Sequence, residues 1–430
     1  MDPALIKKAQ NIVDYETAHD PTIREILRIV KEFIESKRVL CYGGTAINNL
    51  LPVEERFYDP NYEVPDYDFY SEKPQIHALE LADRFYARGF RNIEVKPGAH
   101  LLTFKVFVDY TGVADITYLE PPIFKALWKE DLVKNGIHYV SPNFLRMSMY
   151  LELSRPRGDV SRWEKVYKRL MLLNKHYPVG CKREETKGYA VLSDVQRSGI
   201  EKILHTKSVV LLGLHAVELH SNSKSNVWQT PIDILADDMS ATINQVIQAL
   251  GQDEIDLKER DAFAELLPAH VDIVDKKTGT LIVRVFKTFA CHSYHLLQSG
   301  LRVASIPTLL QFFFAFVYAD AHFIEGGYDQ DRVVCICQRL MDLAASNKKR
   351  RFDLLTPLDC LGHQETLTEM KANKSVLHEK IPKKSQEFLQ LFFSYKPGTL
   401  TKTQKTRVKT ILRKTLKTPR IHDLVTDQTN

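Results

Sequence analysis

Three aspartates and a glycine pair are the residues of this chain whose types and spacing could do chemistry. Asp66 and Asp68 stand one residue apart, downstream of the turn Gly43-Gly44-Thr45, and Asp115 lies further along the chain. In a strand, residues two apart point to the same face, so Asp66 and Asp68 can present their carboxylates side by side. Two such charges repel unless cations lie between them, and carboxylate oxygens suit Mg²⁺ or Mn²⁺ ions that also bind substrate phosphates. The pattern therefore indicates phosphoryl transfer.

Each requirement of a metal-dependent nucleotidyl transfer has a candidate group here. Backbone N–H groups of the glycine pair, at the start of a helix, can hold triphosphate oxygens, and Thr45 can add a hydroxyl donor. Asp66 and Asp68 are expected to hold two ions, one on the triphosphate and one that lowers the pKa of the attacking 3′-hydroxyl. Asp115 is expected to complete the ligand set of the second ion and to help accept the proton.

Simpler interpretations of these motifs remain open. A Gly-Gly pair is common in turns, and Asp-x-Asp is frequent on exposed strands. The flanking Pro65, Phe69 and Tyr70 favour a half-buried strand, in which carboxylates need a partner. Asp109 is an alternative to Asp115 as the third carboxylate ligand, but it lies at the end of an expected hairpin, where aspartate is an ordinary turn residue. We therefore favour Asp115.

Basic residues elsewhere could also meet phosphates. Arg162 and Lys165 follow the expected helix start at Asp159 and could contact the triphosphate, although Arg162 could equally pair with Asp159 or Glu164. The segment 399–420 has eight basic residues and no acidic one. A solvated face is the commoner meaning of such a run, but its composition suits sequence-independent contact with a phosphate backbone.

Length and composition describe an ordinary globular chain. It has 430 residues, of which 44% are hydrophobic and 26% charged, and a formal net charge of +5. This length accommodates two or three domains. The longest strongly apolar run, 309–319, is too short to cross a bilayer, and the N-terminus lacks the apolar core of a signal peptide, so we expect an intracellular protein without membrane contact. The six cysteines lack zinc-like spacing and are expected to be reduced core thiols.

Local patterns predict the elements that must position the candidate residues. Apolar residues at helical spacing predict helices over 3–16 and 21–36, the second with Asp20 as its N-cap and Pro21 in its first turn. We further expect a buried strand over 39–42, a helix from Thr45, a strand over 66–70, a helix over 77–87, and a hairpin of strands over 101–109 and 113–119.

An internal repeat decides the expected architecture. Residues 39–47 resemble residues 209–217, and Pro65-Asp66-Tyr67-Asp68 resembles Pro231-Ile232-Asp233-Ile234. Helix openings at Pro142 and Pro307 and a later Arg-Leu-Met triplet in each half follow in the same order at similar distances. Two copies of one scaffold are therefore expected.

The second copy is expected to be inactive. Ile232 and Ile234 take the positions of Asp66 and Asp68 in our alignment, and a slip of one residue would keep Asp233 but not a pair. The predicted organisation is a helical N-terminal segment over 1–36, a catalytic domain over 37–185, a second, degenerate domain over 186–398 and a basic C-terminal tail over 399–430.

These motifs resemble those of the poly(A) polymerase catalytic subunits of large nucleocytoplasmic DNA viruses, a branch of the polymerase-β-like nucleotidyltransferase superfamily. The matching stretches are 40–47, 65–71, 114–118 with 121–124, and 156–169. The resemblance implies an α/β (α+β) fold of tandem duplicated nucleotidyltransferase-like domains, each a small mixed sheet flanked by helices. It also implies ATP as donor, an RNA 3′-end as acceptor, and a place in the host cytoplasm at the viral factory, with packaging in the virion as a further location.

The expected activity is template-independent addition of AMP to RNA 3′-ends. The alternatives are another terminal nucleotidyltransferase, of uridylyl or oligoadenylate type, or a non-catalytic RNA-binding or processivity subunit. Relatives differ in whether they use a separate processivity subunit or pair with themselves, so both a homodimer and a second subunit stay open. The stretch 51–64 is an insertion relative to the wider superfamily and could reshape the nucleotide or primer entrance.

Overall fold

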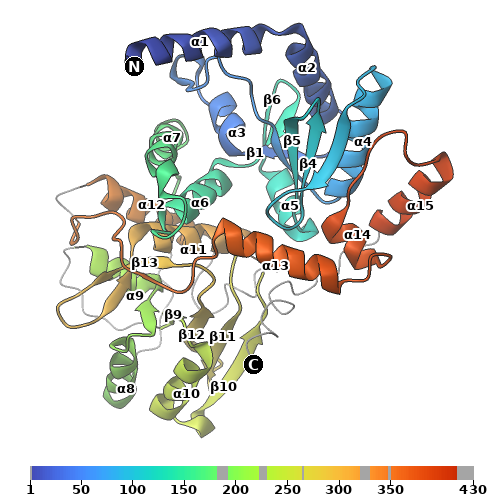
Figure 1. Ribbon diagram of the computed structural model, residues 1–430. Helices are drawn as coiled ribbons and strands as arrows, with labels where there is room; N and C mark the ends of the chain where they lie inside the picture. The colour runs from blue at the N-terminus through green and yellow to red at the C-terminus, as the bar shows by residue number, and fades with distance from the viewer. Residues whose placement is uncertain are drawn as a thin grey trace. The chain divides into compact units, whose positions relative to one another are not determined.

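The chain divides into two compact units. The computed structural model describes residues 2–181, 192–221, 230–263, 266–319, 330–346 and 350–413. One unit comprises Met1–Ser141 together with Thr366–Asn430, and the other comprises Pro142–Glu365. In Figure 1 the first unit runs from blue to teal and resumes in the red C-terminal helices. The units do not coincide with the predicted segments, because the stretch after Pro142 groups with the second unit and the chain after Thr366 returns to the first.

The first unit is a seven-stranded sheet with helices. Its elements are α1 (Pro3–His19), α2 (Pro21–Glu35), β1 (Leu40–Tyr42), α3 (Gly43–Leu50), the 3₁₀ turn η1 (Val53–Glu55), β2 (Asp68–Ser71), α4 (Pro74–Ala87), β3 (Ile93–Pro97), β4 (Thr103–Val108), β5 (Thr111–Tyr118), α5 (Pro121–Lys129), β6 (Leu132–Lys134), β7 (Ile137–Tyr139), α13 (Leu367–Lys380), α14 (Gln386–Phe392) and α15 (Lys402–Arg413).

The first sheet is mixed, with strand order β3-β4-β5-β2-β1-β7-β6. β2 runs parallel to β5 and antiparallel to β1. Apolar positions of α2 recur at helical spacing and are buried, including Ile26, Ile29 and Phe33, so this amphipathic helix packs with α4 on the sheet. One face of the sheet is thereby closed.

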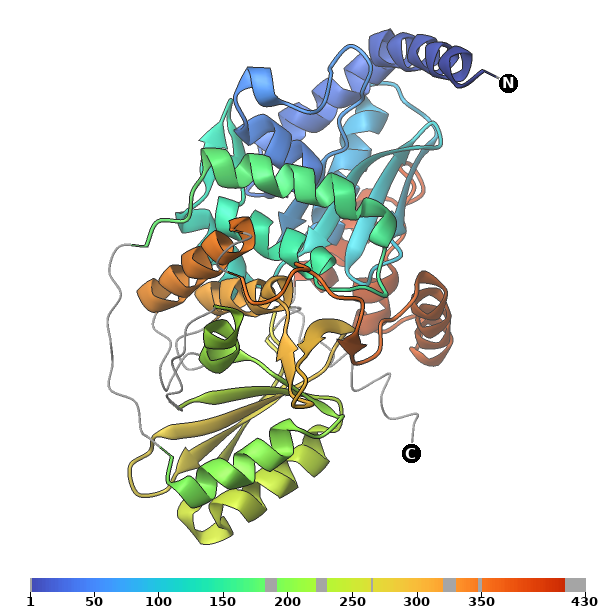
Figure 2. The same ribbon diagram turned by 90° about the vertical axis from the view of Figure 1, so that its left-hand side faces the viewer.

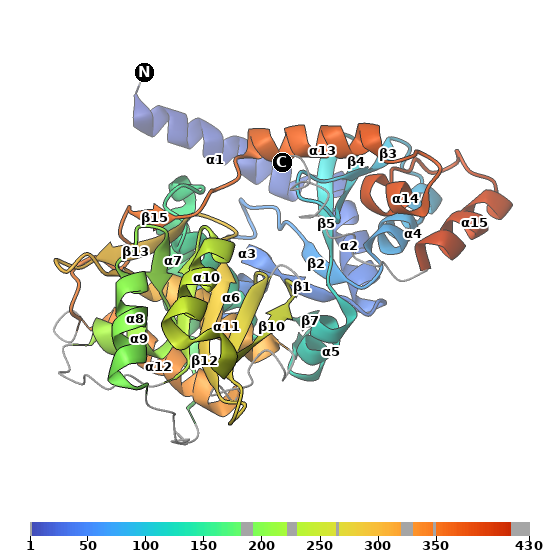
Figure 3. The same cartoon turned by 90° about the horizontal axis from the view of Figure 1, so that it is seen from below.

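The C-terminal segment completes the first unit. α14 and α15 lie beside α4, as Figures 1 and 3 both show. Between the two helices, Tyr395 forms a backbone bridge to Val95 of β3 and donates its hydroxyl to Asp83 of α4 at 2.6 Å. Residues more than 300 positions apart in the chain therefore share one structural unit.

The second unit repeats this design. Its elements are α6 (Pro142–Leu153), η2 (Val160–Arg162), α7 (Trp163–His176), α8 (Asp194–Leu204), β8 (Val209–Leu211), α9 (Gly213–His220), β9 (Ile232–Ala236), α10 (Met239–Leu250), η3 (Gln252–Glu254), β10 (Ile255–Arg260), β11 (His270–Asp275), β12 (Leu281–Lys287), β13 (His292–Leu296), β14 (Arg302–Ala304), α11 (Ile306–Tyr318), α12 (Gln330–Ala345) and β15 (Cys360–Leu361).

The two sheets have the same topology, which confirms the predicted duplication. The second sheet has strand order β10-β11-β12-β9-β8-β14-β13-β15. Its first seven strands repeat the order and the parallel or antiparallel sense of the first sheet, including the parallel pairs β9 with β12 and β8 with β14. The chain is thus a tandem pair of mixed sheets flanked by helices.

The second sheet is covered on both faces. α8 and α10 lie side by side on one face (Figure 2), and every residue of α11 and of β9 is buried. By contrast, β2 of the first sheet alternates between buried and partly exposed residues, and β5 does so from Ala114 to Thr117. A strand buried on both faces reads as a continuous apolar run, whereas a strand with one open face alternates.

Most predicted elements of the first half are confirmed, with one informative difference. The strand expected over 66–70 begins only at Asp68, so Asp66 precedes it.

The prediction of reduced thiols was wrong for four cysteines, because Cys181 bonds to Cys335 and Cys291 to Cys360, while Cys41 and Cys337 are free and buried. These partners are 154 and 69 residues apart, and spacing alone cannot reveal such pairs. In the part of the chain that the structure describes, no helix combines the length and apolar character of a membrane span.

Candidate active site

Three strands of the first sheet place charged residues in one row. The parallel pairing of β2 with β5 sets Asp68 opposite Asp115, and the antiparallel pairing of β4 with β5 sets Lys105 opposite Asp115. Directly opposed residues on adjacent strands share a face and lie close enough to interact. The row Lys105–Asp115–Asp68 therefore crosses the middle of the sheet, and the two aspartates predicted from the sequence meet there.

The row lies on the face of the sheet away from α2 and α4. Phe69 and Ile116, the next residues along β2 and β5, are fully buried in the core, whereas Asp68 and Asp115 are partly exposed. The strand alternation thus separates a dry face, which holds the fold together, from a polar face, which holds the carboxylates.

Gly43 forms the edge of this site. The chain leaves β1 and enters α3 at Gly43, whose φ of +74° is a left-handed conformation that favours glycine. A Cβ atom at Gly43 would lie 2.8 Å from Oδ2 of Asp68, so a side chain there would displace the carboxylate. The backbone at the start of α3 therefore approaches Asp68 closely, as phosphate binding in front of the carboxylates would require.

Asp66 is held in place by Thr45. The Thr45 hydroxyl donates a 2.6 Å hydrogen bond to the backbone carbonyl of Asp66, and the Asp115 N–H donates to the carbonyl of Tyr67 at 3.0 Å. These bonds extend the β2–β5 ladder backward beyond Asp68 and position Asp66 next to the row. The Thr45 hydroxyl is thus used on the backbone in this structure, and its predicted contact with phosphate stays a prediction.

Like charges meet at Asp66. The residue as a whole is exposed, yet loss of water around its carboxyl group, followed by the negative charge of Asp115, raises its pKa, while Lys105 acts in the opposite direction. A cation placed between these carboxylates would relieve their repulsion. Asp66, Asp68 and Asp115 supply the hard oxygen donors that Mg²⁺ and Mn²⁺ prefer, so the residues present fit such an ion.

Lys105 already contacts one of these ligands. Its ammonium lies 2.5 Å from Oδ2 of Asp115. Among the described residues, no three His, Cys, Asp or Glu side chains are arranged to hold a metal ion by themselves. The Lys105–Asp115 pair gives one physical reason, because a carboxylate oxygen that accepts from an ammonium is turned toward that ammonium.

The predicted triphosphate ligands Arg162 and Lys165 belong to the second unit. Arg162 pairs with Glu152 of α6, with Nε 3.2 Å from Oε2, rather than with the two acidic residues considered from the sequence. Lys165 is exposed on α7. The structure of the first unit alone builds the carboxylate site, and the contact of these two residues with a nucleotide stays a prediction.

The second sheet carries a row at the equivalent place in which two of the three charges are reversed. β9 and β12 set Asp233 opposite Arg284, and β11 and β12 set Asp272 opposite Arg284. Arg284 thus occupies the position of Asp115, and Asp272 occupies that of Lys105. Arg284 Nε lies 2.7 Å from Asp272 Oδ1, and both side chains are buried. A buried guanidinium in the centre of the row is the opposite of a cation site.

The alignment of the two copies made from sequence was off by one residue. Leu212 precedes Gly213 as Tyr42 precedes Gly43, and its N–H bonds to the carbonyl of Asp233, so Asp233 takes the place of Asp68. The residue of the second copy that corresponds to Asp66 is then Pro231, whose side chain cannot bind a cation. The conclusion that the second copy lacks the acidic pair is unchanged, and the reason is now Pro231 and Arg284.

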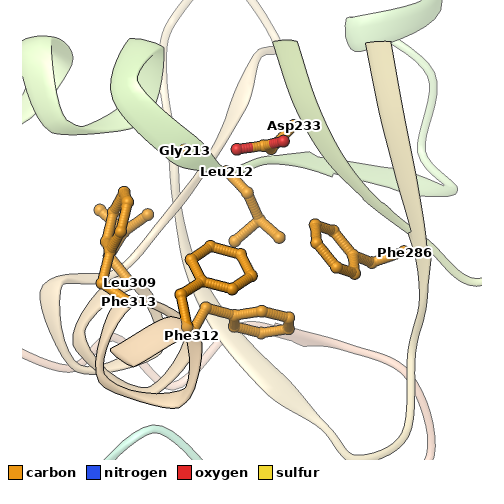
Figure 4. A pocket seen from close by; sticks show the side chains of 8 residues that line it. Leu212, Gly213, Asp233, Phe286, Leu309, Phe312 and Phe313 are labelled. Atoms are coloured by element: carbon orange, nitrogen blue, oxygen red, sulfur yellow. The ribbon is translucent and has the colours of Figure 1, made fainter. Parts of the chain in front are cut away.

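Phenylalanines cover the equivalent site of the second sheet. Figure 4 shows Asp233 and Gly213 above the rings of Phe286, Phe312 and Phe313. The rings from α11 lie where a substrate would have to stand in front of Gly213 and Asp233, and the remaining hollow is small and apolar. The scaffold is retained there, but its polar face has become core.

Three residues of these rows, Lys105, Arg284 and Asp272, were not predicted from the sequence. Lys105 lies in a strand whose expected alternation was recognised, but a lone lysine on a strand gives no signal. Arg284 lies in a strand that was described only as lacking an acidic residue. Only the cross-strand register reveals that Lys105 lies opposite Asp115 and that Arg284 occupies the position equivalent to Asp115.

The two sheets have a nucleotidyltransferase-like fold. The crystal structure of the Megavirus polyadenylate synthase superposes with a TM-score of 0.77 over 96% of this chain and 87% of that chain, at 22% sequence identity. This likeness concerns the fold, and it extends over both copies.

The sequence comparisons point to a particular family. Residues 28–159, which contain Gly43 and all three aspartates, match the family model for the poly(A) polymerase catalytic subunit. The putative poly(A) polymerase catalytic subunit of African swine fever virus, isolate Tick/Malawi/Lil 20-1/1983, is 32% identical over 180 residues, and that of Acanthamoeba polyphaga mimivirus is 30% identical over 184. The matches cover 40% and 41% of this chain but only 38% and 31% of those proteins. The resemblance seen in the motifs is confirmed.

The left-handed glycine supports a matched pair of substitutions. Gly43→Ala puts alanine in a left-handed conformation and places its Cβ against Asp68. Gly213→Ala also puts alanine in a left-handed conformation, at φ +66°, but in the copy that lacks the acidic pair. We expect each to lower the free energy of unfolding by about 1–2 kcal/mol, but only Gly43→Ala to reduce nucleotidyl transfer strongly. Thermal unfolding and incorporation assays measure both, and equal activity of the two variants would contradict this role of Gly43.

The raised pKa of Asp66 predicts a cost in stability at neutral pH. Above that pKa the ionised carboxyl group is less favourable in the folded than in the unfolded state, and this cost disappears as the pH falls through it. Asp66→Asn should therefore raise the unfolding temperature at pH 7 in a chelator, and the difference from the natural protein should shrink at about pH 4, near the ordinary pKa of aspartate. Asp109→Asn, at the exposed hairpin end, serves as control. A variant that is less stable than the natural protein at pH 7 would refute the argument.

Proposed function

We propose that this chain is a template-independent poly(A) polymerase that transfers AMP from ATP to an RNA 3′-end. The observation that carries the proposal is the Asp68–Asp115 pair on parallel strands, with Asp66 beside it and Gly43 against it, inside the region that matches the family. The second sheet, built on the same topology with Arg284 in place of Asp115, shows that this scaffold does not require the carboxylates for folding. Their presence in the first sheet is best explained by chemistry.

The residues divide the reaction among them. The N–H groups at the start of α3 bind triphosphate oxygens, because they carry partial positive charge and Gly43 permits close approach. Asp66 and Asp68 would orient the nucleotide if they hold divalent ions, and Asp115 would face the attacking 3′-hydroxyl and take part in removing its proton. Arg162 and Lys165 are proposed as additional phosphate contacts.

Two divalent ions are part of the proposal. When bound, such ions neutralise charge on the triphosphate and lower the pKa of the attacking hydroxyl. Asp66, Asp68 and Asp115 would hold them, and the open polar face of the sheet leaves these side chains partly exposed to solvent.

The stretch 51–64 after α3 is attached to that helix, because the Asn48 carboxamide oxygen accepts from the N–H groups of Phe57 and Tyr58 at 2.9 and 3.0 Å.

Substitution in both copies tests the assignment. Asp68→Asn should lower tailing by about a hundredfold or more, since an ion contributes several kcal/mol to the transition state and about 1.4 kcal/mol corresponds to a factor of ten. Asp233→Asn, at the equivalent place, should leave activity unchanged. The assay offers each nucleoside triphosphate with a short RNA, so extension with UTP, or short oligoadenylates without primer, would favour the alternative transferases.

A chain that binds RNA but extends it with no nucleotide would support a processivity subunit instead. Undiminished tailing by Asp68→Asn would contradict the proposed active site, whichever nucleotide is added.

The name catalytic subunit, borne by the relatives, supports a second subunit as partner, with a homodimer as the alternative. A place in the host cytoplasm at viral factories, or in virions, is proposed on the resemblance.

The basic C-terminal segment is proposed as part of the RNA path, but only one side of α15 is available for it. Lys405 pairs with Asp83 at 2.8 Å and Lys409 with Glu80 at 2.8 Å, so these two ammonium groups attach α15 to α4. Lys402 and Arg407 are exposed on an open, shallow surface. The predicted contacts of Lys414, Lys417 and Arg420 lie outside the described residues.

Two double variants of α15 separate these roles. Lys402→Ala with Arg407→Ala removes two exposed charges, and Lys405→Ala with Lys409→Ala removes two paired ones. The first should reduce the slope of log K for single-stranded RNA against log salt by about 1.4, at about 0.7 per phosphate contact. The second should lower the unfolding temperature and leave the slope nearly unchanged. Equal slopes for the two variants would show that only net charge matters and would contradict specific contacts.

A further inference from the structure

Lys105 is the residue of the polar face that the reaction as described does not use. It stands on β4, and its ammonium contacts the Asp115 carboxylate at 2.5 Å, with side-chain exposures of 40% and 21%. The pairing is fixed by the cross-strand register rather than by a flexible loop. The ammonium therefore occupies coordination space on the carboxylate that the proposed function assigns to an ion.

The second copy shows that an ion pair at this register position is a property of the scaffold. There Asp272 of β11 and Arg284 of β12 stand in the same two places, 2.7 Å apart, with the charges exchanged. The reversed pair is buried and lies among the phenylalanines of the closed face. In the first copy the acidic member, Asp115, is on β5, beside Asp68 of β2, and the pair is partly exposed, so it can be opened from solvent.

Opening the pair requires a competing cation and a new partner for the ammonium. A divalent ion alone supplies the first but leaves the Lys105 ammonium displaced next to that ion. An ion that arrives with a triphosphate supplies both, because the phosphate charge accommodates the ion and the lysine together. Without Lys105, the carboxylates would not discriminate in this way between a divalent ion alone and a divalent ion that arrives with a triphosphate.

We propose that Lys105 is a tethered counter-cation that holds Asp115 in the nucleotide-free protein and releases it when a divalent ion enters together with the triphosphate. Lys105 is thus a positioning residue that couples metal binding to nucleotide binding. The inference rests on the proposed function, because it concerns the same carboxylates. It predicts that the nucleotide-free site binds divalent ions more weakly than its carboxylates alone would allow.

Titration of Mn²⁺, followed by the electron paramagnetic resonance signal of the free ion, measures this effect without any turnover. In the nucleotide-free protein, Lys105→Met should tighten Mn²⁺ binding by about threefold to fivefold, the equilibrium effect of losing a partly exposed competing ion pair. With a non-hydrolysable ATP analogue present, the difference from the natural protein should fall below about twofold, because the triphosphate then accommodates the Lys105 ammonium and the lysine no longer competes with the ion for Asp115.

Two control variants isolate the role of the ammonium. Lys105→Arg keeps the charge and should bind Mn²⁺ like the natural protein. Lys96→Met removes the same charge one strand further out, opposite Lys105, where the ammonium pairs with Glu94 at 2.6 Å, and it should also bind normally. Unfolding temperatures in a chelator verify that each variant is folded.

The outcomes separate this inference from the proposed function. If the natural protein binds Mn²⁺ with the analogue, and Lys105→Met is folded but binds the ion no more tightly without it, the counter-cation role is overturned and the metal site stands. A gain shared equally by Lys96→Met also overturns it, because the effect is then one of net charge. If neither protein binds Mn²⁺ under either condition, the metal site fails and the inference fails with it.

Discussion

Repulsion between carboxylates on adjacent parallel strands is the constraint on which the first unit depends. The register that sets Asp68 opposite Asp115 is held by the next pair along the two strands, Phe69 and Ile116, which are buried under α2 and α4. A shift of one residue would turn the aspartates into the core and the apolar side chains outward, so packing on one face fixes the charge positions on the other. Lys105 then balances part of the charge in the absence of substrate.

The two copies show how one scaffold can serve opposite purposes. Both retain a left-handed glycine between the first strand and the following helix, and both place an ion pair across equivalent strands, β4 and β5 in the first copy and β11 and β12 in the second. In the second copy the equivalent face is covered by α11, so its ion pair is buried and every residue of the central strand β9 is buried. The same topology therefore provides a reactive surface once and a structural core once.

The sequence predicts much of this arrangement because the signals are local. Helical spacing, an N-cap and strand alternation locate most elements of the first half, and the Asp-x-Asp motif locates the site. The partner of each charge is not local: Lys105 and Arg284 acquire meaning only from strand pairing, and the copies are aligned correctly only once Leu212 is seen to bond to Asp233. The disulfides were missed for the same reason, since their partners are distant in the chain.

The return of the chain to the first unit has a consequence for the order of synthesis. Thr366 and the residues after it contribute the Tyr395 bridge to β3 and the ammonium groups that attach α15 to α4. Domains generally fold as their chains emerge from the ribosome. The second unit is contiguous and is synthesised entirely before these residues, whereas the unit with the carboxylate row receives these pieces only after the second unit has been synthesised. The half of the protein that begins first is thus the half that is finished last.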